Sequence, residues 1–249
     1  MAEVTYPAIL LAAFGFLFAG LVKGATGLGF STSCLPFLVL ALGLDRAMPL
    51  ILIPSLTSNL MVHVQAGEFR RTAQKFWPMF LALIPGLLLG LWLLSSVNLG
   101  YATSVLGAVL IAYATYTLLT PELNLPDTVI NAARIPVGFL TGLVNGLTGS
   151  QIMPVLPYLL SQPLSNNVFL QTVNTSFTIS SLIMMIGLSK IGFLTIDLLI
   201  ISALALFPVF AGVNLGTKLR RRMTTDTFRK AVLMVLIGLG IILILKVVV

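Results

Sequence analysis

The chain has few of the residues on which soluble enzymes depend. Only 8% of its 249 residues are charged, and it contains seven acidic residues, one cysteine and one histidine. The single Cys34 excludes an intrachain disulfide and every metal motif built from several cysteines. Seven scattered acids and one histidine provide no metal cluster and no evident nucleophile with its base. We therefore expect no catalytic residue, no metal and no cofactor, and predict that the protein is not an enzyme.

Apolar residues make up 58% of the chain, and the mean hydropathy is +1.07, values far from those of soluble domains. Runs of about 20 apolar residues are long enough for the ~30 Å hydrocarbon core of a bilayer. The composition predicts an all-α polytopic membrane protein that lies in a lipid bilayer. The eight apolar blocks run approximately over residues 7–42, 45–65, 75–95, 99–119, 132–161, 165–187, 194–215 and 225–247.

A glycine-rich stretch occurs twice. Residues 20–27 read GLVKGATG and residues 142–149 read GLVNGLTG, so six of eight positions are identical. Small residues at this density either break a helix or pack it closely against a neighbour. We infer a duplicated unit, with a first transmembrane repeat over 1–120, a connector over 121–133 and a second repeat over 134–249.

Basic residues concentrate in two loops, which indicates how the repeats are oriented. The loop over 67–75 carries a net charge of +2 and the loop over 216–230 carries +5, so both should be cytoplasmic. In the repeat, however, 216–230 aligns with the uncharged 95–98. Equivalent loops should therefore face opposite sides, which predicts an inverted-topology repeat. Because the basic residues lie between apolar segments, they do not indicate binding to nucleic acid.

The first block of each repeat does not fit a single crossing. Residues 7–42 would measure about 50 Å as one straight helix. Each side of the glycine break would be too short for a comfortable crossing. We therefore expect a broken or re-entrant glycine-rich helix pair in each repeat, followed by three transmembrane helices. Irregular backbone at membrane depth is tolerated where protein or a wet cavity covers it, and it recurs at transporter binding sites.

Lys23 lies inside the first glycine-rich stretch, where a charged side chain is costly. Such a lysine either lines a cavity and finds a partner or extends to the membrane interface. Asn145 occupies the equivalent position in the second stretch, so only one repeat supplies a charge. If both breaks meet near the midplane, the N–H groups of the half-helices would favour an anion.

A predicted substrate site follows from these features. Lys23 would be its electrostatic anchor, and the two breaks would supply backbone donors. Ser, Thr and Asn residues could instead serve as hydrogen-bonding contacts between helices. The predicted substrate-binding residues are Lys23, Gly24, Thr26, Gly27, Asn59, Asn145, Gly146, Thr148, Gly149, Asn174, Thr175 and Ser176.

His63 is the one histidine, and it lies near the end of the second apolar block. It could carry a coupling proton, or it could simply occupy an interfacial position. No intramembrane carboxylate pair stands out. The sequence leaves proton coupling, sodium coupling and passive conduction open, and it also leaves open whether the chain forms a homo-oligomer.

The chain resembles the sulfite exporter TauE/SafE family of membrane permeases over nearly its whole length. The duplicated glycine-rich stretch and the small polar residues 174–176 carry this resemblance, whereas Ser150-Gln151-Ile152 departs from the family's pattern. The resemblance also rests on Gly27-Leu28-Gly29-Phe30, Pro36, Pro157, Pro85-Gly86, Gly90, Gly212 and Gly216.

The resemblance implies a multi-pass permease of the bacterial or archaeal inner membrane. Its substrate would be a small sulfur-containing anion such as sulfite, a sulfonate or a related organosulfur acid, moved by secondary transport. Two alternatives remain: a passive channel for small anions, and a membrane protein with a structural or partner-binding role. In the last case the glycine-rich stretches would be close-packing surfaces only.

Overall fold

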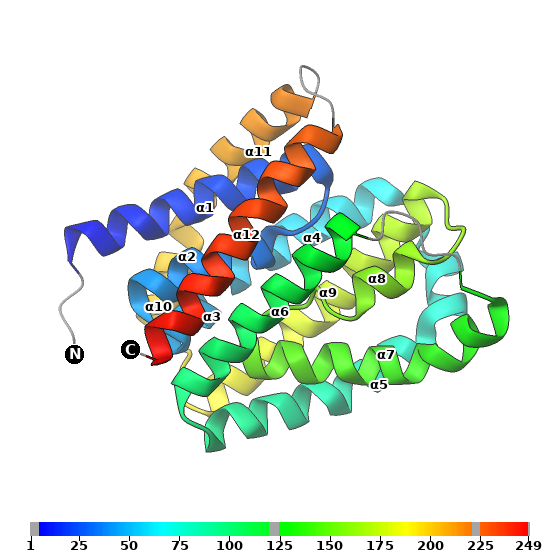
Figure 1. The fold of residues 1–249 in the computed structure, drawn as a ribbon, viewed down its shortest axis with the longest axis horizontal. Helices are drawn as coiled ribbons and strands as arrows, with labels where there is room; N and C mark the ends of the chain where they lie inside the picture. Colours follow the sequence, from blue (N-terminus) through cyan, green and yellow to red (C-terminus); the bar gives the residue numbers. More distant parts are fainter. Residues whose placement is uncertain (1–4, 120–124, 221–224, 249) are drawn as a thin grey trace.

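The computed structural model describes residues 5–119, 125–220 and 225–248, and within these ranges the secondary structure is helical throughout (Figure 1). The helices are α1 (Tyr6–Thr26), α2 (Phe30–Leu42), α3 (Leu44–Leu50), α4 (Leu52–Ala66), α5 (Phe69–Ser96), α6 (Leu99–Leu119), α7 (Asp127–Thr148), α8 (Val155–Leu160), α9 (Asn166–Lys190), α10 (Ile196–Leu204), α11 (Leu206–Arg220) and α12 (Thr225–Val248).

Seven helical segments of the described chain are long and apolar enough to cross a bilayer, which supports the prediction of an all-α polytopic protein. Two of these segments combine consecutive helices, α3 with α4 and α10 with α11. The segments are Tyr6–Thr26, Leu44–Ala66, Phe69–Ser96, Leu99–Leu119, Asn166–Lys190, Ile196–Leu219 and Phe228–Val247. Because α1 alone is one of them, our expectation that each side of the first break is too short was wrong for α1.

The breaks follow the glycine-rich stretches and do not lie within them. Helix α1 continues through Gly20 and Gly24 and ends at Thr26. Gly27 and Gly29 then adopt left-handed backbone conformations, each with φ of 76°. Gly149 has the same φ at the end of α7. Glycine is the residue that takes this conformation without a steric penalty, so the last glycine of each stretch terminates its helix.

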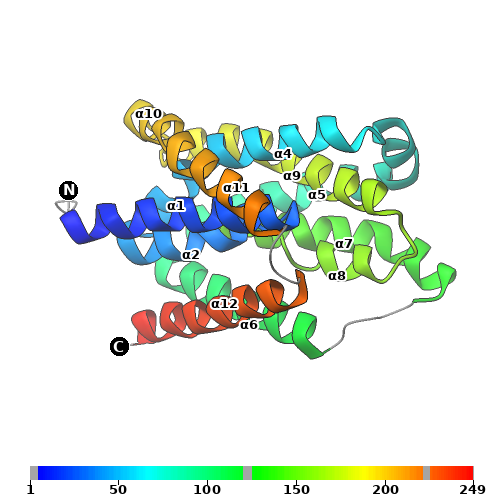
Figure 2. The ribbon, with the colours of Figure 1, turned by 90° about the horizontal axis from the view of Figure 1, so that it is seen from above.

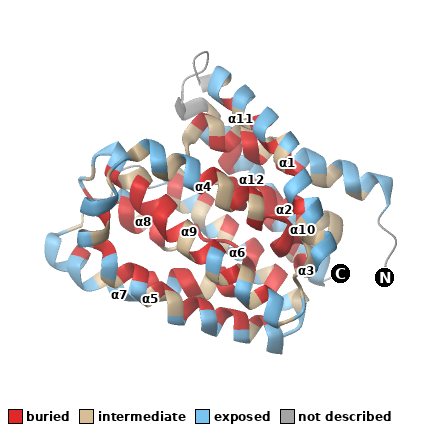
Figure 3. Cartoon of the chain, turned by 180° about the vertical axis from the view of Figure 1, so that it is seen from behind, coloured by how far each residue is buried: buried red, intermediate tan, exposed pale blue. Residues whose placement is uncertain are grey.

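The short helix after each break is the most enclosed part of its repeat. Residues 30–39 of α2 are all buried, as are four of the six residues of α8 (Figure 3). Protein covers the irregular backbone before α8 over residues 149–152, and it covers that before α2 over residues 27–29 only in part. This is the environment in which unpaired backbone groups are tolerated at membrane depth.

Two apolar blocks that we expected to be single helices are divided near prolines. Helix α3 gives way to α4 at Ile51, three residues before Pro54. Helix α10 gives way to α11 at Ala205, three residues before Pro208. A proline has no N–H to donate, and its ring crowds the carbonyl of the preceding turn, so helices bend or break just before it.

The most extensive helix contacts join α1 to α11 and α5 to α7, so each glycine-rich helix packs against a helix of the other repeat. These contacts are close because they involve glycines. A Cβ atom at Gly24 would lie 2.2 Å from the carbonyl oxygen of Val213, and one at Gly142 would lie 2.1 Å from that of Leu83. The stretches therefore serve as close-packing surfaces within the fold.

The path of the chain is clear in Figure 2. The start of α1 and the end of α12 lie at the same end of the molecule, the α4–α5 turn lies toward the opposite end, and α11 ends near the middle. Helix α7 begins at Asp127, inside the connector that we expected over 121–133. Arg70, Arg71 and Lys75 belong to the first turns of α5 and not to a loop. Helices at the two basic regions thus continue further than hydropathy indicated.

Substituting Gly142 with alanine should destabilise the fold by about 1–3 kcal/mol, because the new methyl group would overlap the backbone of α5. Gly238, also inside a helix, is the matched control, since a Cβ there meets no atom within 4 Å. Gly238→Ala should be neutral or stabilising, by up to about 1 kcal/mol. Thermal unfolding of both variants in detergent measures the difference. Equal melting temperatures would contradict the close-packing role.

Candidate functional site

Lys23 is 4% exposed, and its ammonium group binds two asparagines from different helices. Lys23 Nζ donates to Asn59 Oδ1 of α4 at 2.8 Å and to Asn174 Oδ1 of α9 at 2.8 Å. Lys23 therefore does not extend to an interface, and it joins three helices. We call Lys23, Asn59 and Asn174 the Lys23 cluster.

The orientation of both amides follows from their remaining hydrogen bonds. Asn59 Nδ2 donates to Ser55 Oγ at 3.3 Å, and Asn174 Nδ2 donates to the carbonyl oxygen of Leu170 at 2.8 Å. The amide oxygens are therefore turned toward the ammonium group, which can only donate. The structure brings together three residues that the sequence analysis placed in the site.

No carboxylate among the described residues pairs with Lys23, whose partners there are the two neutral amides. A buried charge normally requires an opposite charge or a dense set of hydrogen bonds. The ammonium group has three hydrogens, of which the two amides accept two. The two amides thus hold the Lys23 side chain in place, and no anionic group among the described residues binds it.

A chain of hydrogen bonds leads from the Lys23 cluster to a small buried cavity. Beyond Asn59, Ser55 Oγ shares a hydrogen bond of 2.9 Å with Ser31 Oγ. Both serines line the cavity, which has a volume of about 10 Å³. The complete lining is Ser31, Met48, Ile51, Leu52, Ser55, Asn145, Gly149, Gln151, Ser181 and Met184.

Four polar atoms at this cavity have no hydrogen-bond partner among the described residues. They are both amide atoms of Asn145, Gln151 Oε1 and Ser181 Oγ, and all three side chains are buried. An unpaired buried polar group costs about 1–3 kcal/mol, so proteins retain few of them without a reason. Their convergence on one cavity is typical of a site that binds a polar ligand.

Several predicted site residues have a local structural role. Gly24 and Gly146 face neighbouring helices, where a Cβ would meet the carbonyl oxygens of Val213 and Leu87. The N–H groups of Gly27 and Gly149 close their own helices by donating to Lys23 O and Asn145 O, both at 2.7 Å. These four glycines, which lie within or end α1 and α7, therefore do not present open backbone donors.

The two threonines of the glycine-rich stretches form hydrogen bonds with backbone oxygens next to the breaks. Thr26 Oγ1 can donate its one proton to the carbonyl oxygen of Val22 at 2.9 Å or to that of Leu28 at 3.1 Å, and Thr148 Oγ1 donates to that of Val144 at 2.6 Å. Ser176 likewise donates to a backbone oxygen of its own helix. Thr175, by contrast, contacts His63 across the α4–α9 interface.

The sequence analysis did not include Ser31, Ser55, Gln151 and Ser181 among the site residues. Gln151 follows the second glycine-rich stretch directly, and Ser31 follows Gly29 by two residues, so proximity to the breaks was an available signal. Nothing in the local sequence distinguishes Ser181 from Ser180, because both lie in a polar run of α9. Only the packing of the helices brings these side chains to one cavity.

A second cavity of about 290 Å³ lies beside the first break. Its wall includes Thr26, Gly29, Thr32 and Ser33 from the break and the start of α2. Arg229 of α12 contributes a positive charge to the same cavity. A mostly apolar space with a few polar groups and one arginine thus lies next to the helix that carries Lys23.

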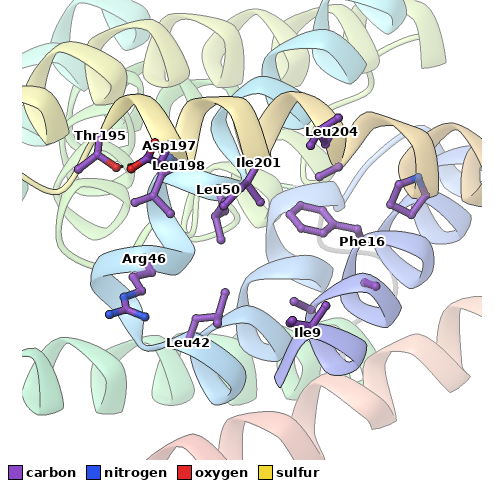
Figure 4. A pocket seen from close by; sticks show the side chains of 14 residues that line it. Ile9, Phe16, Leu42, Arg46, Leu50, Thr195, Asp197, Leu198, Ile201 and Leu204 are labelled. Atoms are coloured by element: carbon purple, nitrogen blue, oxygen red, sulfur yellow. Dashed lines mark hydrogen bonds between the residues drawn. The ribbon is translucent and has the colours of Figure 1, made fainter. Parts of the chain in front are cut away.

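A third cavity of about 720 Å³ is apolar and shares no residue with the Lys23 cluster. It lies between α1, α3, α10 and α11. Figure 4 shows Arg46 and Asp197 toward one end of this cavity and Phe16 and Leu204 toward the other. Its aliphatic lining is unsuited to a small anion.

Within the described residues, the structure thus defines a multi-pass helical membrane protein with a buried cationic site beside a polar cavity. A family model described as sulfite exporter TauE/SafE matches residues 11–243. The chain therefore belongs to this family of membrane transporters, as its glycine-rich stretches indicated. Searches of curated proteins and of solved structures found no match.

Replacement by leucine should lower the stability of the protein at Asn174 but not at Asn145. Asn174→Leu removes an acceptor from the Lys23 ammonium and should destabilise the protein by about 1.5–3 kcal/mol. Asn145→Leu removes two unpaired polar atoms and should leave stability unchanged or raise it by about 1 kcal/mol. Thermal unfolding of the two variants without added anion tests this. Similar destabilisation by both would mean that Asn145 has a structural partner.

Proposed function

We propose that the protein is a permease that moves a small sulfur-containing anion, such as sulfite or a sulfonate, by secondary transport. The observation that carries this proposal is the Lys23 ammonium group, buried and bound only by neutral amides within the described chain. An anionic substrate would supply the missing negative charge. Family membership supports the class of substrate.

The hydrogen-bonding groups around the cavity suit an oxyanion. Asn145 Nδ2, Ser181 Oγ and the serine pair Ser31 and Ser55 offer donors, and sulfite and sulfonate groups present several acceptor oxygens. The proposed binding residues are therefore Lys23, Asn145, Ser31, Ser55 and Ser181. Asn59 and Asn174 hold the ammonium group in place.

The size of the cavity favours a carrier over a passive channel. A volume of about 10 Å³ is the room of about one water molecule, which is too small for an anion of several atoms. Substrate must then enter through a conformational change that enlarges the cavity. The space beside Arg229 and the first break is the proposed route of entry, because it combines a positive charge with polar backbone.

We further propose that the repeats over 1–120 and 134–249 have inverted topology about this site. The reciprocal packing of α1 on α11 and of α7 on α5 supports this arrangement, because each glycine-rich helix then contacts the other repeat in an equivalent way. In such folds one repeat or bundle moves against the other around a central site. We propose the bacterial or archaeal inner membrane as the location.

A panel of anions tests the proposed function. Purified protein should melt at a higher temperature with at least one of sulfite, sulfate, thiosulfate, sulfoacetate, taurine and short carboxylates. At an anion concentration of 100 Kd the gain is about 2.7 kcal/mol. Lys23→Met should abolish the anion-dependent shift, and uptake into proteoliposomes should fall with it. Lys190→Met, which removes an exposed lysine at the end of α9, is the matched control.

Counterflow distinguishes a carrier from a channel. Proteoliposomes loaded with unlabelled anion should accumulate labelled anion transiently, because a carrier exchanges substrate across the membrane. Linear, non-saturable uptake without counterflow would favour a passive channel. An anion-dependent shift that survives in Lys23→Met would remove Lys23 from the site.

A further inference from the structure

The apolar cavity of about 720 Å³ is charged at one end only. Arg46 and Asp197 lie toward that end, and Phe16 and Leu204 lie toward the other (Figure 4). Apart from Thr195, the remaining side chains of the lining are apolar. A lining divided in this way suits an amphipathic ligand, because its polar group and its hydrocarbon chain each meet a matching surface.

The cavity opens on a surface that faces the bilayer. Three side chains of its lining, Ile9, Ile201 and Leu204, are between 50% and 57% exposed. All three belong to segments that are long and apolar enough to span a membrane. Exposed aliphatic side chains of such segments face hydrocarbon and not water. The molecules that can enter the cavity from this side are therefore those of the bilayer itself.

The position of the cavity along the spans corresponds to one leaflet. Arg46 and Asp197 each lie within the first three residues of a candidate span, Leu44–Ala66 and Ile196–Leu219, which places them at the level of the lipid headgroups. Pro208 is the lining residue furthest along α11, and it lies about 17 Å beyond Asp197 at 1.5 Å per helical residue. Half of the hydrocarbon core measures about 15 Å. The cavity therefore has the depth of one acyl chain.

The two charged side chains indicate the chemistry of the headgroup. Neither Arg46 nor Asp197 forms an ion pair with another described residue, although Arg46 is half-buried. A guanidinium group binds phosphate through two parallel N–H bonds, and a carboxylate accepts N–H bonds from a primary ammonium group. A lipid with a net negative charge would be repelled by Asp197. A headgroup that carries both a phosphate and a primary amine matches the pair.

We propose that this cavity binds a phospholipid with an ethanolamine headgroup, whose phosphate contacts Arg46, whose ammonium group contacts Asp197 and whose acyl chain fills the apolar part. The lining combines α1 and α3 with α10 and α11, so the lipid joins helices from opposite ends of the sequence. Because the site shares no residue with the Lys23 cluster, it does not depend on which anion is transported.

Native mass spectrometry of the detergent-solubilised protein tests the phosphate contact. Phosphatidylethanolamine should bind, and Arg46→Gln should raise its Kd by at least about tenfold, because charge-assisted hydrogen bonds are lost. Arg46→Lys keeps the positive charge and should retain most of the affinity. Arg70→Gln removes an exposed arginine of α5 that does not line the cavity, and this matched control should bind as wild type. Equal Kd values for wild type and Arg46→Gln would overturn the proposal.

Three lipids with identical acyl chains test the contact with Asp197. Phosphatidylethanolamine should bind the wild type more tightly than phosphatidylcholine, whose quaternary ammonium has no N–H, and more tightly than phosphatidylglycerol, which has no amine. Asp197→Asn should remove the preference over phosphatidylcholine, since both lipids carry the phosphate. Equal binding of all three lipids by the wild type would overturn the assignment of the headgroup, as would a preference that is unchanged in Asp197→Asn.

Filling the cavity tests the position of the acyl chain. Ala13 lines the cavity and is exposed, so Ala13→Phe adds a ring there without displacing the protein core. It should weaken the binding of phosphatidylethanolamine and reduce the lipid-dependent rise in melting temperature. Ala203→Phe, at an exposed position of α10 outside the lining, is the matched control. Unchanged affinity in Ala13→Phe would overturn the proposal, and so would equally tight binding of oleate, which has a chain but no phosphate.

Discussion

The close approach of helix backbones at glycine is the constraint on which the rest of the structure depends. Lipid provides no hydrophobic force that drives one apolar helix onto another, so contact must come from packing and from polar groups. Where α1 meets α11 and α7 meets α5, the glycines leave no space for a Cβ atom. These contacts hold the second half of α1 inside the protein and with it Lys23, whose amide partners come from two further helices. The helix that makes the close glycine contacts, α1, therefore also carries Lys23.

The buried polar residues differ in how many of their hydrogen-bonding atoms have a partner. At Lys23 each amide has an assigned role, and the hydrogen-bond chain continues through Ser55 to Ser31. At Asn145, the counterpart of Lys23 in the second repeat, neither amide atom has a partner among the described residues. The duplicated unit has thus kept a charge on one side and an uncommitted amide on the other. The asymmetry is thus one of side-chain type: an amine in the first stretch and an amide in the second.

Hydropathy predicted the class of protein and the approximate helices because lipid-exposed segments must satisfy their backbone internally. It misplaced details that depend on single residues. Gly20 and Gly24 remain helical because the neighbouring backbone covers them, whereas Gly27 ends α1 with a left-handed conformation. The apolar block over 45–65 is divided at Ile51, three residues before Pro54. Hydropathy averaged over about 20 residues does not reveal where a single glycine or proline ends a helix.

The sequence alone shows the recurrence of the glycine-rich stretch, the membrane class and the unusual position of Lys23 within an apolar segment, because each rests on residue type and order. The hydrogen-bond partners of Lys23 could not be identified from the sequence. Asn174 is 151 residues from Lys23; α1 is apolar on most sides, and the many polar residues of α9 do not gather on a single face. Without a contrast between a wet and a dry face, periodicity does not indicate which side of such a helix points inward. Only the packing of α1, α4 and α9 decided that two asparagines, one from each repeat, meet on a single ammonium group.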